Sequence, residues 1–283
     1  SAYPKPHLLY VKEKFQLDDI LYFLFLCAFL YETDTTLSSY VYKKTKASFL
    51  SLGILLSWYS GLYPLPVNAA AVCMAFLNED ILFQRIEETY LMMTPVRLQA
   101  YVLYYLSSGC LPQHKAFRYV EVSQQTFASI YKEQLAELLK NITLNKSCIL
   151  AAEAHAGKRT LALQCAKTLE EPVFLLSGIA WKQADVKERF HILNCIVFFI
   201  RLQDGGIVYL DTKEELLREE ISYLEYFFNC LNIPVIISAE SVITNRYPVI
   251  QLPPYLSAAD LRTMSFFLWG KEWVKSYLHM TPQ

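Results

Sequence analysis

AAEAHAGKRT, residues Ala151–Thr160, follows the apolar run Ser147–Leu150 and decides the fold that we expect for this chain. A phosphate-binding loop has the pattern G-x-x-x-x-G-K-[ST] between a strand and a helix. Its backbone N–H groups hold phosphate, its lysine reaches the β- and γ-phosphates, and its hydroxyl binds Mg²⁺. Gly157 and Lys158 match the end of that pattern. The stretch therefore predicts a nucleotide-binding fold.

Two positions of the loop depart from the pattern. Ala152 replaces the first glycine, Arg159 stands where the Mg²⁺-binding hydroxyl belongs, and Thr160 comes one residue late. A guanidinium at a metal site disfavours Mg²⁺ by like-charge repulsion, although its planar fork suits direct contact with phosphate. We therefore expect binding of ATP, ADP or another anion, with His155 beside the loop, and we expect Mg²⁺ to be disfavoured.

From Ser147 onward, short apolar runs alternate with segments of helical periodicity. This alternation is typical of a parallel sheet covered by helices on both faces, which is the context that a P-loop requires. The predicted strands are Cys148–Ala152, Val173–Leu176, Ile207–Asp211, Val235–Ser238 and Val249–Leu252, and the predicted helices are Lys158–Leu169, Ala180–Leu202, Glu214–Cys230 and Ser257–Trp269.

The first part of the chain reads as helices. Leu17–Tyr31 is one, and Thr94-Pro95 fits the start of another that runs to Ser107. Asn78–Ile86 fits either a short helix or the β-wing of a winged helix. We expect a helical, winged-helix-like domain over 1–118, a connecting helix over 119–146, a degenerate P-loop-like α/β domain over 147–256, and the start of a lid or exit helix over 257–283.

Composition describes a well-cored, ordered protein. Apolar residues make up 54% of the 283 residues, and the net charge of −1 excludes strong bulk attraction to nucleic acid or anionic membranes. The seven cysteines form no C-x-x-C pair and predict buried free thiols in a reducing cytoplasm. The longest apolar run, Ile20–Tyr31, falls short of the roughly 20 residues of a membrane span. The start of the sequence shows no signal peptide.

A second candidate element of a nucleotide site is the strand Ile207–Asp211. In P-loop enzymes a strand ending in Asp orders Mg²⁺, and a following Glu polarises the attacking water. Here Thr212 stands in the place of that Glu, and a hydroxyl is too weak a base for the task near neutral pH. Asp211 fits a metal ligand or a helix cap equally well, and Glu214 has a role only if the site is active.

Two further residues are candidates for contact with the terminal phosphate. Ser238 ends the strand that begins at Val235, where a polar side chain can sense the γ-phosphate, and the alternative is a strand end that turns polar at the surface. Arg246 precedes the last strand, where an arginine finger can reach a neighbouring subunit, and the alternative is a surface arginine.

Four motifs occur together along the chain. They are Phe15, Leu17, Leu24, Leu26, Cys27, Ala28, Glu32 and Asp34, the turn Gly157–Ala162, the helix-plus-strand Ile200–Gln203 to Leu210-Asp211, and the exit Leu252-Pro253-Pro254 to Ala259. Together they resemble one family, the AAA+ ATPases encoded with contractile injection systems and phage-tail-like particles. The resemblance implies a helical or winged-helix segment followed by a degenerate AAA+ module, which often precedes a second, intact module in a longer ATPase.

Three functions compete. The first is a degenerate AAA+-like module that assembles or regulates an ATPase, with weak or no hydrolysis. Its partners would be other AAA+ modules, subunits of the same protein or a client protein. The second is a competent ATPase that uses Lys158, Asp211 and Glu214. The third is a winged-helix DNA-binding regulator, suggested by the basic cluster Lys43, Lys44 and Lys46.

Overall fold

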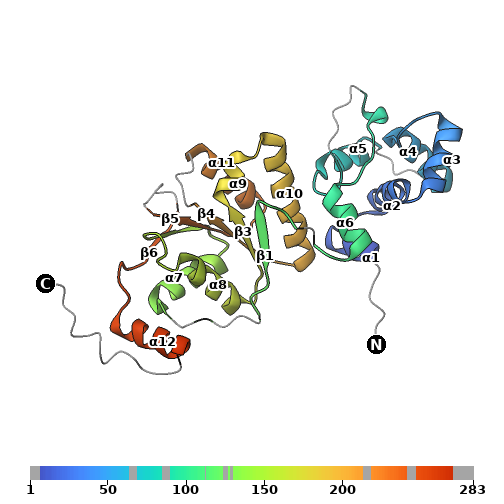
Figure 1. Cartoon of the computed structure of the whole chain (residues 1–283). Helices are drawn as coiled ribbons and strands as arrows, with labels where there is room; N and C mark the ends of the chain where they lie inside the picture. The colour runs from blue at the N-terminus through green and yellow to red at the C-terminus, as the bar shows by residue number, and fades with distance from the viewer. Residues whose placement is uncertain are drawn as a thin grey trace. The chain divides into compact units, whose positions relative to one another are not determined.

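Two units divide the chain in this computed structural model (Figure 1). The first contains residues 1–112 and 190–204, and the second contains residues 113–189 and 205–283. Residues 190–204 therefore group with the helical part of the chain, although in the sequence they fall between two segments of the α/β part. The described residues are 7–63, 69–84, 90–111, 113–123, 127, 130–212, 218–240 and 247–269.

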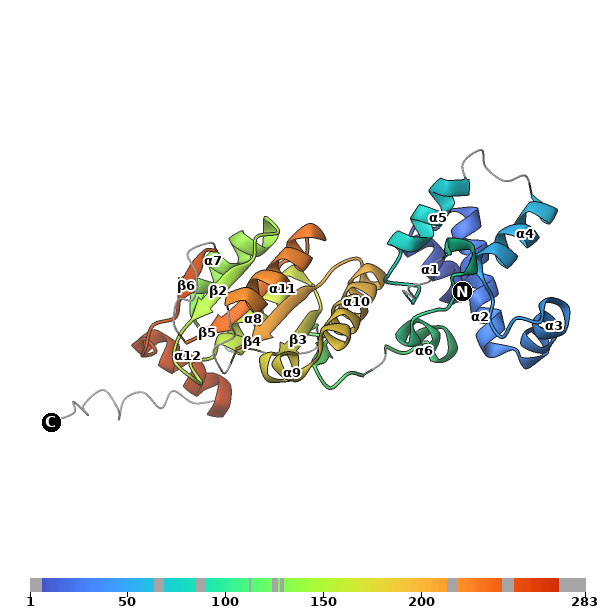
Figure 2. The same cartoon turned by 90° about the horizontal axis from the view of Figure 1, so that it is seen from above.

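The first unit is made of helices. In chain order they are α1 (His7–Lys14), α2 (Asp19–Thr33), α3 (Thr35–Thr45), α4 (Leu52–Leu62), α5 (Ala69–Asn78), the 3₁₀ turn Leu91–Met93, α6 (Ala100–Ser108) and most of α10 (Val186–Gln203). Helix α2 contacts α3, α4 and α5, which surround it in Figure 2. Polar side chains begin these helices: Asp18 accepts a 2.7 Å hydrogen bond from the N–H of Leu21, and Asp34 accepts one of 2.7 Å from Thr36.

The helix predicted from Pro95 begins later, at Ala100, and this part of the prediction is wrong. Residues 94–99 are extended because neighbouring segments hold their backbone. The N–H of Val96 donates to Leu50 at 2.8 Å, and that of Gln99 donates to Leu82 at 2.9 Å. The predicted end is confirmed, since Gly109 caps α6 with a φ of +69°. Isolated bridges pair Ser51 with Pro95 and Phe83 with Leu98, and the described residues of this unit form no longer strand ladder.

The second unit is built on a six-stranded sheet with the order β1-β3-β4-β5-β2-β6. The five strands from β2 to β6 run parallel, as predicted, and β1 pairs with β3 in the antiparallel sense. The strands are β1 (Phe117–Val120), β2 (Cys148–Ala151), β3 (Val173–Ser177), β4 (Ile207–Asp211), β5 (Val235–Ala239) and β6 (Val249–Gln251).

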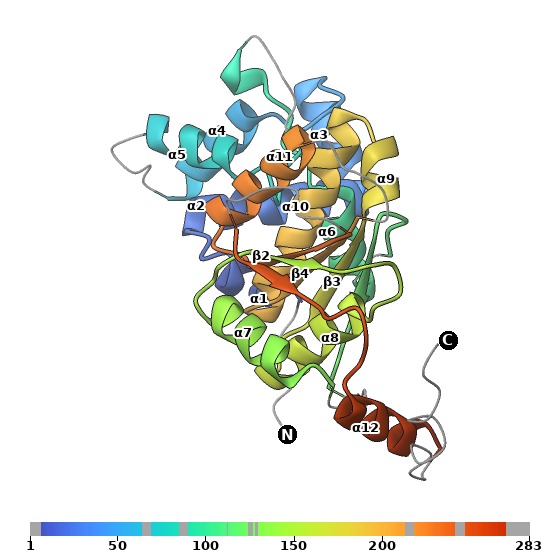
Figure 3. The same cartoon turned by 90° about the vertical axis from the view of Figure 1, so that its left-hand side faces the viewer.

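Helices cover both faces of this sheet. Figure 3 shows α7 (Lys132–Thr143) and α8 (Lys158–Leu169) on one face, with α9 (Gly178–Gln183) and α11 (Arg218–Cys230) on the other. The α8 face buries Leu150, Ile236 and Leu161 among other apolar side chains. Helix α12 (Ala258–Trp269) follows β6 and lies outside these layers. The chain thus has an α/β fold of the P-loop type, in which β2 leads into α8.

Two predictions about this unit need correction. The connecting helix expected over 119–146 is limited to Lys132–Thr143, because Phe117–Val120 form strand β1. The single helix expected over Ala180–Leu202 is two helices, α9 and α10. Asp185 separates them, since its carboxylate accepts a 2.8 Å hydrogen bond from the N–H of Glu188 and so starts α10.

Within the described part of the chain, no single helix is long and apolar enough to cross a membrane. Helices α2 and α3 pass the test of length and hydropathy for a membrane span only when they are taken together, and they meet at a bend of 104°. All seven cysteines are free thiols. Four are buried, whereas Cys110 and Cys230 are exposed, so the expectation of buried thiols holds only in part.

Candidate functional site

The loop between β2 and α8 has a backbone conformation suited to binding an anion. Gly157 caps α8 with a φ of +87°, which only glycine adopts without strain, and His155 is also left-handed, with a φ of +62°. No side chain caps the first turn of α8. The N–H groups of that turn and the positive end of the helix dipole are therefore oriented toward a negative ligand. Ala152 has no positive φ, so the missing first glycine leaves no strain there.

Lys158 lies across the mouth of this loop. Its ammonium donates to the carbonyls of Ala152 at 2.6 Å and Glu153 at 2.9 Å. Burial lowers the pKa of Lys158, while the charges of Glu240 and Asp211 act in the opposite direction. A bound phosphate would compete with the two loop carbonyls for the hydrogen bonds of this ammonium.

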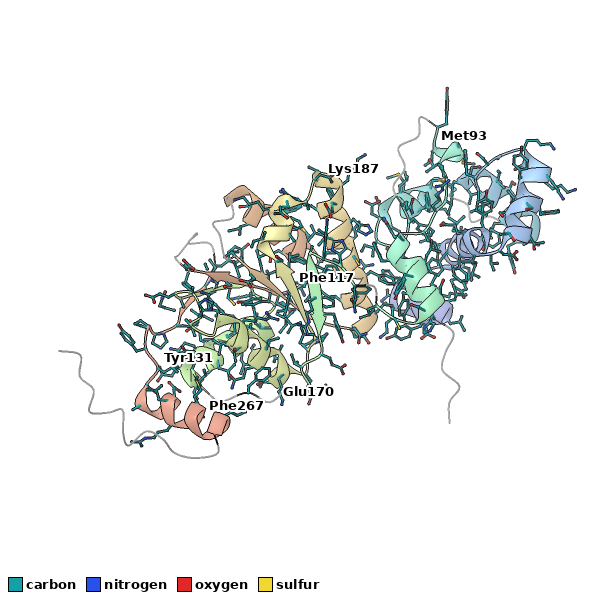
Figure 4. The ribbon with its side chains drawn as sticks, in the orientation of Figure 1. Met93, Phe117, Tyr131, Glu170, Lys187 and Phe267 are labelled. Atoms are coloured by element: carbon teal, nitrogen blue, oxygen red, sulfur yellow. The ribbon has the colours of Figure 1, made fainter. Side chains whose placement is uncertain are left out.

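Tyr131 supports the loop from outside, a role that the sequence did not suggest. It directly precedes α7 (Figure 4), is buried, and donates from its hydroxyl to the carbonyl of Ala156 at 3.0 Å. Burial raises the pKa of this hydroxyl, so it stays a donor at neutral pH. The contact fixes the residue before Gly157. No motif marks the position, because the bond joins residues 25 positions apart in the sequence.

A polar row crosses the carboxyl ends of three strands. Ser177 pairs in register with Asp211, and Asp211 pairs with Ser238, so the three side chains share the α8 face of the sheet. Ser177 caps α9 by accepting from the N–H of Ala180 at 3.3 Å. The side chain of Ser238 bonds to the hydroxyl of Tyr209, whose pKa burial raises to about 12. Asp211 is half-buried, and its charge acts on Lys158.

Thr212 does not face this row. It is 6% exposed, and its hydroxyl donates to the backbone carbonyl of Ser238. Successive strand residues point to opposite faces, so the residue after Asp211 leaves the α8 face. The position where a catalytic carboxylate was sought is therefore a buried structural contact between β4 and β5.

The groups nearest the Mg²⁺ position of the motif include a guanidinium and a carboxylate. Arg159 and Thr160 are both exposed on the first turn of α8, and Asp211 supplies the one carboxylate of the polar row. Among the described residues, no group of three or more His, Cys, Asp or Glu side chains is placed to hold a metal ion. Octahedral Mg²⁺ needs oxygen donors, and a guanidinium supplies none.

Two predicted site residues, Glu214 and Arg246, lie outside the described residues. His155 is exposed within the loop. The basic cluster Lys43, Lys44 and Lys46 is exposed at the carboxyl end of α3, where positive charge complements the helix dipole.

A basic pocket opens beside the loop, on the side of β1. Its volume is about 280 Å³, and its lining includes Lys115, Arg118, Arg159, Tyr209 and Asp211. The turn into β1 lies just before Phe117, which is labelled in Figure 4. Sequence reasoning missed Lys115 and Arg118 because it assigned both to the helical domain over 1–118 and did not predict strand β1.

Comparison with protein-family models finds no match, and neither does comparison with curated proteins. Among solved structures, the chain is similar to the Thermotoga maritima RuvB Holliday junction branch migration motor, with 17% sequence identity and a TM-score of 0.38. The match covers 52% of this chain and 53% of the RuvB chain, about half of each. The P-loop-type fold is assigned from the strand order and from the geometry of the loop between β2 and α8.

Proposed function

We propose that this chain is a degenerate AAA+-like module that binds ATP or ADP at the start of α8. It hydrolyses ATP weakly or not at all, and it acts in the assembly or regulation of a larger ATPase. The proposal rests on a contrast between two parts of the site. The loop at Gly157 and Lys158 keeps the geometry of an anion-binding site, whereas the hydroxyl of Thr212 is buried and bonded to the backbone of Ser238.

The binding half of the proposal rests on the loop. Two left-handed residues and the uncapped first turn of α8 point N–H groups at one place, and Lys158 adds a positive charge next to it. The exposed guanidinium of Arg159 follows directly and can contact a phosphate oxygen in place of Mg²⁺. Nucleotide binding should therefore persist when Mg²⁺ is chelated.

The catalytic half rests on the missing base. Activation of water requires a group that accepts a proton near neutral pH, and a buried threonine hydroxyl does not. Asp211 is the carboxylate of the polar row, and no second carboxylate follows it at position 212.

The biological setting of the proposal comes from the sequence resemblance alone. It suggests that this module works beside other AAA+ modules or subunits of the same protein, within an ATPase of a contractile injection system and in the cytoplasm. A client protein is part of that proposal.

Equilibrium titration with a fluorescent ATP analogue, with Mg²⁺ and with EDTA, tests both halves. We expect binding in both buffers, loss of binding in Lys158→Ala, and unchanged binding in Arg262→Ala, an exposed arginine of α12 outside the site. Phosphate release should stay at background. Robust turnover that disappears in Lys158→Ala would overturn the proposal and support a competent ATPase.

A further inference from the structure

The basic pocket beside the loop shares only Arg159 and Asp211 with the nucleotide site proposed above. None of residues 152–158 lines it, and Arg159 is the one residue that it takes from α8. Its other walls come from the turn into β1 and from the carboxyl ends of β3 and β4. The pocket therefore lies next to the P-loop, shares Arg159 and Asp211 with the nucleotide site, and takes the rest of its lining from β1, β3, β4 and the turn before β1.

Register places the pocket's groups on one face of the sheet. Arg118 of β1 pairs with Leu175 of β3, and Leu175 pairs with Tyr209 of β4. Paired residues point to the same side of a sheet, so these three form a row on the face that α8 covers. Arg159 approaches the same row from α8, since its charge acts on Tyr209. Leu175 and Tyr209 thus form a floor flanked by two arginines.

The charges in this pocket do not balance. Lys115 is paired with Glu188 at 2.9 Å. Among the described residues, neither Arg118 nor Arg159 forms a salt bridge, and Asp211 is the one carboxylate of the lining. Two guanidinium groups that share one small pocket repel each other unless an anion lies between them.

Size and donor geometry narrow the class of ligand. A volume of about 280 Å³ lies at the lower end of the roughly 300–1,000 Å³ of small-molecule sites, which suits a small anion better than a whole nucleotide. The Ser177 hydroxyl accepts from a backbone N–H and keeps its own proton to donate. Two guanidinium forks and a hydroxyl offer more donors than one carboxylate can accept, whereas a phosphoryl group has three acceptor oxygens.

We propose that this pocket, between β1 and the start of α8, is a second anion site that binds a phosphoryl group through Arg118 and Arg159 independently of Lys158. The phosphoryl group comes either from inorganic phosphate or from a small phosphorylated ligand. The two sources share this chemistry.

The test compares binding of inorganic phosphate, pyrophosphate and acetate to the full chain by ligand-observed NMR and thermal shift. Phosphate should bind the wild type and Lys158→Gln equally, and Arg118→Gln should weaken binding by about tenfold or more, the effect of losing one charge-assisted bond. The surface variant Arg262→Gln is the matched control and should behave as the wild type. Stronger binding of pyrophosphate than of phosphate identifies a phosphorylated ligand as the source, and equal binding identifies free phosphate.

Three outcomes would overturn the proposal: no phosphate binding to the wild type, unchanged binding in Arg118→Gln, or loss of binding in Lys158→Gln alone, which would place phosphate on the P-loop. Acetate binding as strong as that of phosphate would also contradict the phosphoryl assignment. Arg118 is exposed, so its substitution should leave the fold intact. Phosphate-induced shifts of the arginine Nε resonances in the wild type provide a second readout that needs no variant. A wild-type chain that binds phosphate but not ATP would contradict the proposed nucleotide function and leave the second anion site standing.

Discussion

Replacing Thr212 with glutamate restores the carboxylate that a P-loop ATPase uses, and we predict that it destabilises the α/β unit without creating an ATPase. Thr212 is 6% exposed, and its hydroxyl donates to the carbonyl of Ser238. A glutamate at this position loses that hydrogen bond, adds atoms to a filled space, and places its carboxyl group away from the α8 face.

The size of the effect follows from the lost hydrogen bond and the added atoms. An unsatisfied buried carbonyl costs about 1–3 kcal/mol. Overpacking adds about 1–3 kcal/mol. Thr212→Glu should therefore lower the free energy of unfolding by about 2–6 kcal/mol, a large share of the roughly 5–15 kcal/mol of a typical domain. Thr212→Val removes only the hydroxyl and should cost about 1–3 kcal/mol.

Urea unfolding, followed by circular dichroism, measures these differences. Thr212→Ser keeps the hydroxyl and is the matched control, with an expected cost below that of Thr212→Val. Burial raises the pKa of the introduced carboxyl in the folded state, so the penalty of Thr212→Glu should be smallest below about pH 4 and grow as the pH rises through the folded pKa. A Thr212→Glu protein as stable as the wild type, with ATP turnover above background, would refute the reasoning.

Other positions give further predictions. Gly178→Ala should lower the free energy of unfolding in urea by about 1–3 kcal/mol, because the added Cβ would lie 2.6 Å from a backbone oxygen of β4. Gly61→Ala should raise that free energy by up to about 1 kcal/mol, because alanine favours the helix and the added Cβ meets no atom within 4 Å. Equal effects at the two glycines would contradict this reasoning. Tyr131→Phe removes the hydrogen bond to Ala156 and should lower the free energy of unfolding by about 1 kcal/mol and weaken nucleotide binding. Unchanged nucleotide affinity would show that the loop holds its shape without that bond. Burial raises the pKa of Glu79, so its contribution to stability is present at low pH and lost as the pH rises through the folded value. The stability of wild type relative to Glu79→Gln, measured by urea unfolding, should therefore fall as the pH rises above about 4, the unfolded value of a glutamate. A difference that rises with pH would show that the pKa is lowered instead.

The α/β part of the fold was largely readable from the sequence. Strands β2, β4 and β5 are buried on both faces and therefore appear as short apolar runs. Gly157-Lys158 marks a turn in which a left-handed glycine precedes a helix. The predicted strand Ile207–Asp211 and helix Lys158–Leu169 have the bounds of β4 and α8.

Other parts depend on contacts between distant segments. Strand β1 has four residues, and burial at its two ends is set by pairing with β3, so its sequence shows no long alternating pattern. The basic pocket was missed for that reason. Local sequence also gave no sign that the hydroxyl of Thr212 bonds to β5, because this contact joins residues 26 positions apart.

Binding of ATP to the wild-type chain in EDTA and in Mg²⁺, measured together with phosphate release, tests the central claim most directly. The account predicts the same affinity in both buffers and no turnover, since Arg159 stands at the metal position and Thr212 is buried. Binding that requires Mg²⁺, followed by turnover that Lys158→Ala abolishes, would contradict it.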